Sequence, residues 1–172
     1  MHRFLIWLSG WLRVRFIDVD GKPYLERYLI LQLFGYGVFL HRFVSQDGER
    51  HLHDHPWAWS VGIPICGGYI EERFTRFDSR IGICTEPRSV GLLSFNWLGV
   101  NSLHRIASVR RNTWTLFAHS RRVKHWGFVE QLSFDEQSFH LRYSQPLPVS
   151  ASDDHLRQCP RARTVRLQEA SS

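Results

Sequence analysis

Short β-type segments separated by turn-forming residues fill the central part of this chain, and this rhythm limits its fold more than any other feature. The segments, which are rich in β-branched and aromatic residues, are 24–33, 37–44, 57–65, 68–77, 90–95 and 114–118. Turn formers such as Gly67-Gly68 and Asp78-Ser79-Arg80 separate them, and no helical pattern of about 10–15 residues lies between them. The spacing therefore predicts an all-β sandwich or barrel rather than a parallel sheet with crossover helices.

The two ends of the chain differ from this central part. Residues 1–12 carry apolar side chains at helical spacing, interrupted by Ser9-Gly10, and predict a short N-terminal helix. Residues 146–172 contain three prolines, several arginines and few large apolar residues, which predicts a basic, mobile tail. We therefore expect three parts: an N-terminal helix and turn (1–23), a barrel (24–145) and the tail (146–172).

With 172 residues, 43% of them hydrophobic and 22% charged, the chain has the size and composition of one globular domain. No apolar run reaches the about 18–20 residues that a membrane span requires, and the first residues lack the pattern of a signal peptide. Three widely spaced cysteines form no CxxC pair, which argues against a disulfide framework and a structural zinc site. We therefore expect a cytoplasmic protein that does not bind membranes.

The basic charge of the chain points to anionic partners without identifying them. The net charge is +6, and all but Lys22 and Lys124 of the 22 basic residues are arginines. A positive charge of this kind attracts anions in general. Because no nucleic-acid recognition motif accompanies it, we expect a small anionic molecule rather than nucleic acid as the partner.

Three of the ten histidines, His51, His53 and His55, follow one another at a spacing of two. In a strand, side chains at this spacing lie on the same face, so two neutral imidazoles can bind one divalent metal. A third ligand must then come from elsewhere, and His104, which follows a turn bounded by Gly99, is a candidate. Imidazole suits zinc, iron, copper and nickel, so the pattern does not select the metal. A solvated loop is the alternative interpretation of the cluster.

These blocks together resemble the two sequence motifs of the cupin superfamily. The first motif is matched by Gly48, His53, His55 and Gly67, and the second, more loosely, by Gly91, Gly99 and His104. Within the superfamily, four strings resemble a group of small bacterial and phage cupin-like proteins: His53-Asp-His-Pro-Trp57, Gly67-Gly-Tyr-Ile-Glu-Glu72, His104-Arg105 and Trp126-Gly-Phe128. The resemblance implies a double-stranded β-helix, or jelly roll, with a metal inside the barrel and three histidines, His53, His55 and His104, as its ligands.

The chain departs from the cupin pattern at one ligand. The glutamate of the family should fall near Trp59 or Ser60, and neither residue is acidic. The site is then a three-histidine arrangement, as in thiol dioxygenase-like cupins, or it recruits Glu71 or Glu72 from the next segment. A barrel that binds no metal is the third alternative.

Other side chains are predicted to act around this metal. A shift of register would make His51 and His53 the ligand pair, but the spacing of Pro56 and Gly67 fits the cupin pattern better with His53 and His55. We therefore assign His51 a catalytic role as proton carrier, because an unperturbed imidazole titrates near neutral pH. We assign a second catalytic role to Tyr69. For substrate binding we select Arg73, which shares a strand face with Tyr69, and Arg105, because an arginine fork suits a carboxylate or phosphate.

Three neutral ligands leave the charge of a divalent ion uncompensated and leave coordination positions open, which favours an anionic substrate and, for Fe(II), dioxygen. The leading hypothesis is a mononuclear metal-dependent cupin enzyme, namely a non-heme Fe(II) dioxygenase or hydroxylase acting on a small anionic or thiol-bearing substrate. Two alternatives stay open: a sugar or sugar-acid isomerase or epimerase that uses zinc, nickel or manganese, and a non-catalytic binding module. A homodimer also stays open, as an expectation from the superfamily.

Overall fold

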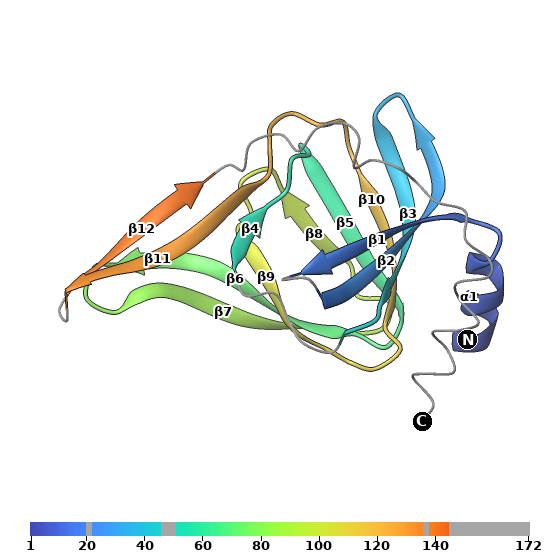
Figure 1. Cartoon of the computed structure of the whole chain (residues 1–172), viewed down its shortest axis with the longest axis horizontal. Helices are drawn as coiled ribbons and strands as arrows, with labels where there is room; N and C mark the ends of the chain where they lie inside the picture. The colour runs from blue at the N-terminus through green and yellow to red at the C-terminus, as the bar shows by residue number, and fades with distance from the viewer. Residues whose placement is uncertain (20–21, 46–50, 136–137, 145–172) are drawn as a thin grey trace.

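The structure is a computed structural model that describes residues 1–19, 22–45, 51–135 and 138–144. The predicted tail and Gly48 lie outside these described residues. The strands form two six-stranded antiparallel sheets arranged as a jelly roll (Figure 1). The predicted all-β class and double-stranded β-helix are therefore confirmed.

Sheet A has the strand order β1-β2-β3-β10-β5-β8, and sheet B has the order β12-β11-β4-β9-β6-β7. The elements are α1 (His2–Ser9), β1 (Arg13–Val19), β2 (Lys22–Leu33), β3 (Tyr36–Phe43), β4 (Leu52–Asp54), β5 (Trp59–Cys66), β6 (Tyr69–Asp78), β7 (Gly82–Val90), β8 (Asn96–Gly99), β9 (His104–Val109), β10 (Trp114–His119), β11 (Gly127–Asp135) and β12 (Ser138–Ser144). We call the sides of the sheets that face each other their inner faces. The described residues contain no helix with the length and apolarity of a membrane span.

The predicted N-terminal helix is present as α1, and it packs on the outer face of sheet A. Leu5 of the helix lies in one buried cluster with Tyr28, Leu40 and Trp114 of the sheet. The indole Nε1 of Trp114, a fully buried side chain, donates a hydrogen bond to Nδ1 of His2 at 2.9 Å. A buried aromatic side chain contributes much of the packing energy of a small domain, so these contacts fix α1 on the barrel.

Two local assignments from the sequence differ from the structure. Residues 13–19, for which no strand was predicted, form β1, an edge strand that buries Val14 against β2 and leaves most other side chains at least partly exposed. The segment 90–95, predicted as a strand, is mostly the turn between β7 and β8. Leu93 in this turn has a positive φ of 58° and is 72% exposed. Exposed apolar residues in a turn produce the same sequence signal as a buried strand.

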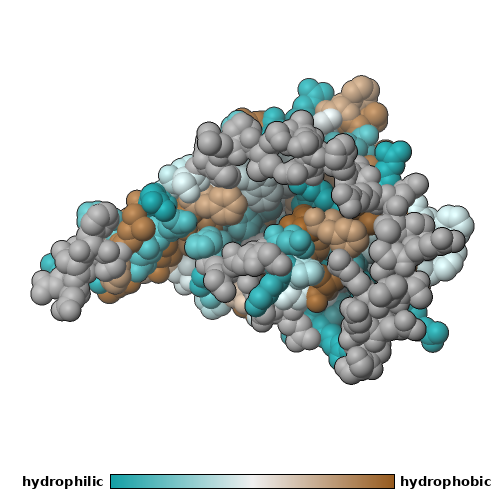
Figure 2. All heavy atoms as spheres, viewed as in Figure 1, coloured by the Kyte–Doolittle hydropathy of each residue, from teal (hydrophilic) through white to brown (hydrophobic). Residues whose placement is uncertain are grey.

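Two long hairpins, β6–β7 and β11–β12, extend from sheet B, and their ends lie side by side (Figure 1). The amide of Phe139 donates to the carbonyl of Ser79 at 2.8 Å, and the amide of Ile83 donates to Oε1 of Gln131 at 2.8 Å. A cavity of about 400 Å³, which we call the outer cavity, lies between the hairpins and is lined by residues of β4, β7, β9 and β11. At the other end, hydrophobic side chains gather over the tip of the β2–β3 hairpin (Figure 2).

Candidate metal centre

Three histidines from two distant stretches of the chain converge inside the barrel. His53 lies on β4, His55 follows β4 directly, and His104 begins β9, where it pairs with His53 across the sheet. Their ring nitrogens all lie within 4.8 Å of one another, and Nε2 of His55 is 2.8 Å from Nε2 of His104. The three side chains are only 5–7% exposed. Among the described residues, this is the one group of metal-ligating side chains that meets at a common point.

The local sequence explains why the first two histidines point the same way. Strand alternation places His53 and the preceding Leu52 on opposite faces, and Pro56 cannot continue the strand ladder beyond His55. Asp54 points away from the histidines and fixes β4 against β11. Its carboxylate accepts hydrogen bonds from the amide of Gly127, from Nζ of Lys124 and from the hydroxyl of Tyr143, at 3.0, 2.7 and 2.9 Å. Asp54 is therefore a structural residue of the β4–β11 pairing and not a member of the metal-ligating group.

The ring nitrogens of the triad suit a divalent metal. Two imidazole nitrogens at 2.8 Å can form a hydrogen bond only if one carries a proton, whereas a cation between them would accept both lone pairs. Nδ1 of His55 is buried and has no hydrogen-bond partner among the described residues. Burial, followed by the neighbouring charges of His104 and His53, lowers the pKa of His55 well below its usual range. The ring is therefore neutral at neutral pH, which is the form that binds metals.

Glu71 on β6 contacts the opposite side of the His104 ring. The carboxyl group is completely buried, and its Oε1 lies 2.7 Å from Nδ1 of His104. Burial raises the pKa of Glu71, but the contact with His104 and hydrogen bonds from Asn96 and Arg73 outweigh it and hold the pKa at about 2. An ionised carboxylate beside Nδ1 leaves the lone pair of Nε2 directed at the centre of the triad. Glu71 therefore orients a candidate ligand.

The structure favours the three-histidine arrangement over a site with a carboxylate ligand. Glu71 contacts His104 on the side away from the other two rings, and the metal-ligating group contains no carboxylate. Glu72 alternates to the other face of β6, where its Oε2 pairs with Nη2 of Arg105 at 2.7 Å. Ser60, at the position of the cupin glutamate, is fully buried, and its hydroxyl has no hydrogen-bond partner among the described residues.

Tyr69 and Arg73, predicted to act on the substrate, belong to the inner network around Glu71. Asn96 donates to the Tyr69 hydroxyl at 3.1 Å, and burial raises the pKa of Tyr69 above its usual range, so the phenol stays protonated. The guanidinium of Arg73 is engaged by Glu71, by Oδ1 of Asn96 at 2.6 Å and by the carbonyl of Trp97 at 3.1 Å. The predicted shared face of Tyr69 and Arg73 is therefore seen, while their roles stay predictions.

His51 and Arg105, the other two predicted site residues, are not brought to the triad. His51 is exposed, and both residues line the outer cavity together with Leu52 and Val129. Leu52 and Val129 are register partners next to the pair formed by His53 and Phe128, so alternation turns them away from the triad. Arg105 directly follows His104 in β9 and therefore points outward as well.

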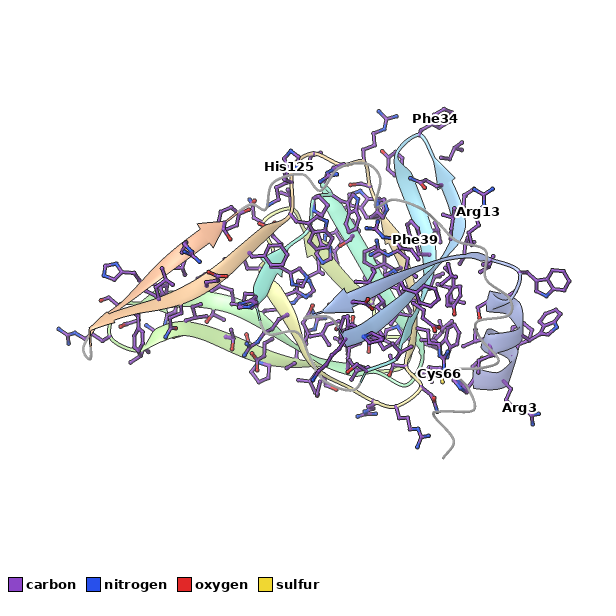
Figure 3. The ribbon with its side chains drawn as sticks, viewed as in Figure 1. Arg3, Arg13, Phe34, Phe39, Cys66 and His125 are labelled. Carbon is purple, nitrogen blue, oxygen red and sulfur yellow. The ribbon has the colours of Figure 1, made fainter. Side chains whose placement is uncertain are left out.

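Arg27, which was not among the predicted site residues, places a cation on the inner face of sheet A. Nε of Arg27 on β2 donates to Nε2 of His41 on β3 at 3.0 Å. Its guanidinium carbon lies 5.2 Å from the ring centre of Phe39, 5.7 Å from that of Phe117 and 5.9 Å from that of Trp57. Figure 3 labels Phe39 near the middle of this sheet. The signal in the sequence was an arginine between Leu25 and Leu29, two apolar residues on the same face of the strand.

Aromatic rings connect this arginine with the triad. Trp57 stacks on His55 with ring centres 5.3 Å apart and on His119 with ring centres 4.0 Å apart. Trp126 closes the other side, 4.9 Å from His55 and 5.5 Å from His53. The triad therefore lies among buried aromatic rings, with the candidate ligand nitrogens supplied from sheet B and its neighbouring loop and the arginine from sheet A.

No family model and no curated protein matches the sequence, but solved structures share the fold. HppE, solved with Fe(II) and the alternative substrate (S)-1-HPP, has a TM-score of 0.51 at 6% identity, over 65% of this chain and 57% of that chain. This chain thus matches little more than half the length of HppE. KdgF from Halomonas sp. has a TM-score of 0.46 at 14% identity, over 62% of this chain and 94% of that chain. Uridine-bound PAC13 from Streptomyces has a TM-score of 0.44 at 11% identity, over 76% and 85%.

Proposed function

Because this chain has the cupin fold, we propose that it is a mononuclear metal-dependent enzyme in which His53, His55 and His104 hold one divalent ion. The observation that carries the proposal is the convergence of three buried imidazoles whose nitrogens lie within 4.8 Å of one another. A cluster of this kind without an ion would leave ring nitrogens facing each other inside the protein, at a cost in desolvation free energy. Binding an ion uses those nitrogens as ligands.

The proposed reaction is that of a non-heme Fe(II) oxygenase on a small anionic or thiol-bearing substrate. Three neutral nitrogen ligands suit Fe(II), and when bound the ion supplies a Lewis-acidic, redox-active centre with open coordination positions. HppE, which contains Fe(II) in its solved form, has the same type of fold. Cys66 and Cys84 are free thiols, which supports a reducing, cytoplasmic location.

Arg27 and the aromatic rings around the triad would bind and orient such a substrate. Arg27 lies across the barrel from the triad and would hold the anionic end of the molecule. His41 accepts a hydrogen bond from Nε of Arg27 and so would fix the plane of the guanidinium. The rings of Phe39, Trp57 and Phe117 are 6–8% exposed and would exclude water from the substrate. Glu71 would keep His104 in position, and its buried contact with Nδ1 of His104 supports this role.

Metal analysis of purified protein tests the proposal. We expect about one equivalent of metal in the wild type and a large loss in His55→Ala, with no loss in His125→Ala, which removes an exposed histidine outside the barrel. Equal metal content in the wild type and His55→Ala would reject the site. With Fe(II) restored, oxygen uptake that depends on a carboxylate or thiol substrate is expected, and full turnover without oxygen would reject the oxygenase assignment.

A further inference from the structure

The outer face of sheet A has the wrong polarity for a surface in water. An antiparallel sheet with one solvated face normally carries apolar residues on its inner face and polar residues on its outer face. In sheet A the inner face carries polar groups such as Arg27, His41 and His119. The outer face carries apolar side chains along β3, β10, β5 and β8. The inner face also carries apolar rings such as Phe39 and Phe117, so both faces of sheet A are apolar, and an apolar outer face indicates that something other than water covers it.

α1 covers only part of this outer face. The helix packs over Tyr28, Leu40 and Trp114, towards β1 and β2. Beyond it lies a second region, which we call the open face, formed by Tyr36, Trp59, Val61, Phe95, Trp97 and Leu116. Strand register places these side chains together, because Val61 is the direct partner of Trp97 and of Ala118, and Leu116 is the direct partner of Ile63.

Aromatic rings run across the open face in one row. Ring centres are 6.4 Å apart for Tyr36 and Trp59, 5.2 Å for Trp59 and Trp97, and 6.2 Å for Phe95 and Trp97. Phe95 is 58% exposed, Trp97 47% and Tyr36 46%. A fully covered aromatic side chain buries about 150–250 Å², so the exposed parts of these three alone come to about 300 Å². A patch of this size lies within the range of the largest apolar patch on a typical monomer, which is often functional.

The chemistry of the open face selects a second copy of this chain as its occupant. All six defining residues are uncharged, and Arg121, 5.7 Å from the ring centre of Tyr36, adds a single positive charge at one end of the row, so the face offers little charge complementarity to nucleic acid or to an anionic membrane. In a two-fold dimer the same patch of both chains is in contact. Like charges in such a patch would repel each other, whereas apolar side chains bury each other. Leu92 and Leu93, 62% and 72% exposed in the turn before β8, add apolar surface next to the open face, and a standard interface takes about 800 Å² from each partner. Interfaces of stable homodimers are also the most apolar class.

We propose that the open face is a homodimer interface in which the aromatic rows of two chains pack against each other. The triad lies on the inner side of the barrel, so each chain keeps a complete metal centre. The proposal is therefore independent of the proposed enzymatic activity.

Sedimentation of the full chain over a micromolar dilution series tests this interface. We expect a mass of twice 20.3 kDa for the wild type. Leu116→Glu places a charge in the middle of the open face, on the outward side of β10, and should weaken the dimer on the order of 100-fold. The control is Ile81→Glu, which changes an exposed apolar residue in the β6–β7 turn, away from the open face, and should remain a dimer.

A second variant separates loss of the interface from loss of the fold. Trp97→Ala removes an outward-facing ring from edge strand β8, and it should give a folded monomer with wild-type circular dichroism and metal content. A wild-type mass of 20.3 kDa at all concentrations would overturn the proposal. A dimer that survives both Leu116→Glu and Trp97→Ala would overturn it equally, because the copies would then meet elsewhere.

Discussion

Two groups of buried histidines lie in the same barrel and differ in what their ring nitrogens contact. In the triad, nitrogens of three rings meet, with the Nε2 atoms of His55 and His104 only 2.8 Å apart. In the second group, His41 and His119 turn their ring faces to aromatic neighbours instead. His41 stacks on Phe117 with ring centres 4.7 Å apart, and the Trp57 ring lies 4.0 Å from that of His119.

The nitrogens of the second group are committed to protein partners. Nε2 of His41 accepts from Arg27, and Nδ1 of His119 lies 2.7 Å from the carbonyl of Ser120. Burial is the largest cause of a lowered pKa in both His41 and His119, and the same is true of His55. Burial and a lowered pKa therefore do not distinguish a metal ligand from a packing residue. The two groups are distinguished by the atoms that their ring nitrogens face: other imidazole nitrogens in the triad, and a guanidinium or a backbone carbonyl in the second group.

The largest expected effect separates the two groups by metal affinity. His104→Ala removes one nitrogen from the triad and should lower the affinity for a divalent metal by more than about 100-fold, because a protein ligand contributes more than the groups that orient it. His119→Ala should leave the affinity within about threefold of the wild type. Titration of chelator-treated protein with Fe(II) or Zn(II) measures both. Equal losses of metal affinity in His104→Ala and His119→Ala would show that the triad is not the metal site.

A smaller effect is expected from the carboxylate behind the triad. Glu71→Gln removes the negative charge next to Nδ1 of His104 but keeps a side chain of the same size. Groups that orient a metal ligand typically change affinity by about 10–100-fold, and because the amide retains an oxygen we expect about 10-fold. Glu72→Gln, on the other face of the same strand, is the control and should bind metal as the wild type does. A wild-type affinity in Glu71→Gln would show that Glu71 does not act through His104.

Substitution of Arg27, which pairs with His41 of the second group, should weaken anion binding and leave metal binding intact. We expect Arg27→Gln to weaken binding of benzoate to the metal-loaded protein by about 10-fold, because a charge-assisted hydrogen bond contributes about 1.5–3 kcal/mol. Benzamide, the uncharged analogue, should bind both proteins alike. Arg73→Gln and Arg105→Gln are the comparison variants, and calorimetry measures all of them. A larger loss in either of these would return the anion site to the arginines selected from the sequence.

The triad and the fold could be predicted because their signals are local. The spacing of His53 and His55, with a third histidine after a glycine-bounded turn, is visible in the sequence, and so is the succession of turns that limits the chain to an all-β fold. Arg27 and His41 lie far apart in the sequence and meet only through the β2–β3 register. The alternation of a strand also does not reveal which of its faces is inward.

The same ambiguity explains the remaining differences. Apolar residues of β5 and β8, such as Val61 and Trp97, suggest a core when read from the sequence, yet they lie on the outer face of sheet A. Arg105 was selected because it follows His104, but adjacency in a strand places two side chains on opposite faces. His51 shares its spacing with the triad, but it precedes the first residue of β4 and is exposed.

The smallest expected effect concerns the pH dependence of stability, to which both histidine groups contribute in the same direction. Burial lowers the pKa of His41 and of His55 well below the value of about 6.5 that histidine has in an unfolded chain. Below about pH 6.5 the unfolded chain therefore binds protons that the folded chain does not, so the free energy of unfolding decreases as the pH falls. Above that pH both states are neutral, and these groups add no pH dependence.

Denaturant unfolding of metal-free protein at pH 7.5 and pH 5.5 measures this dependence. The wild type should lose stability between the two values, and His41→Phe should lose less, because phenylalanine keeps the stack on Phe117 but binds no proton. His140→Phe, which removes an exposed histidine from the hairpin strand β12, should follow the wild type. If His41→Phe and the wild type lose equal stability on acidification, His41 is not held neutral by burial, and the second group would differ from the triad in protonation as well as in geometry.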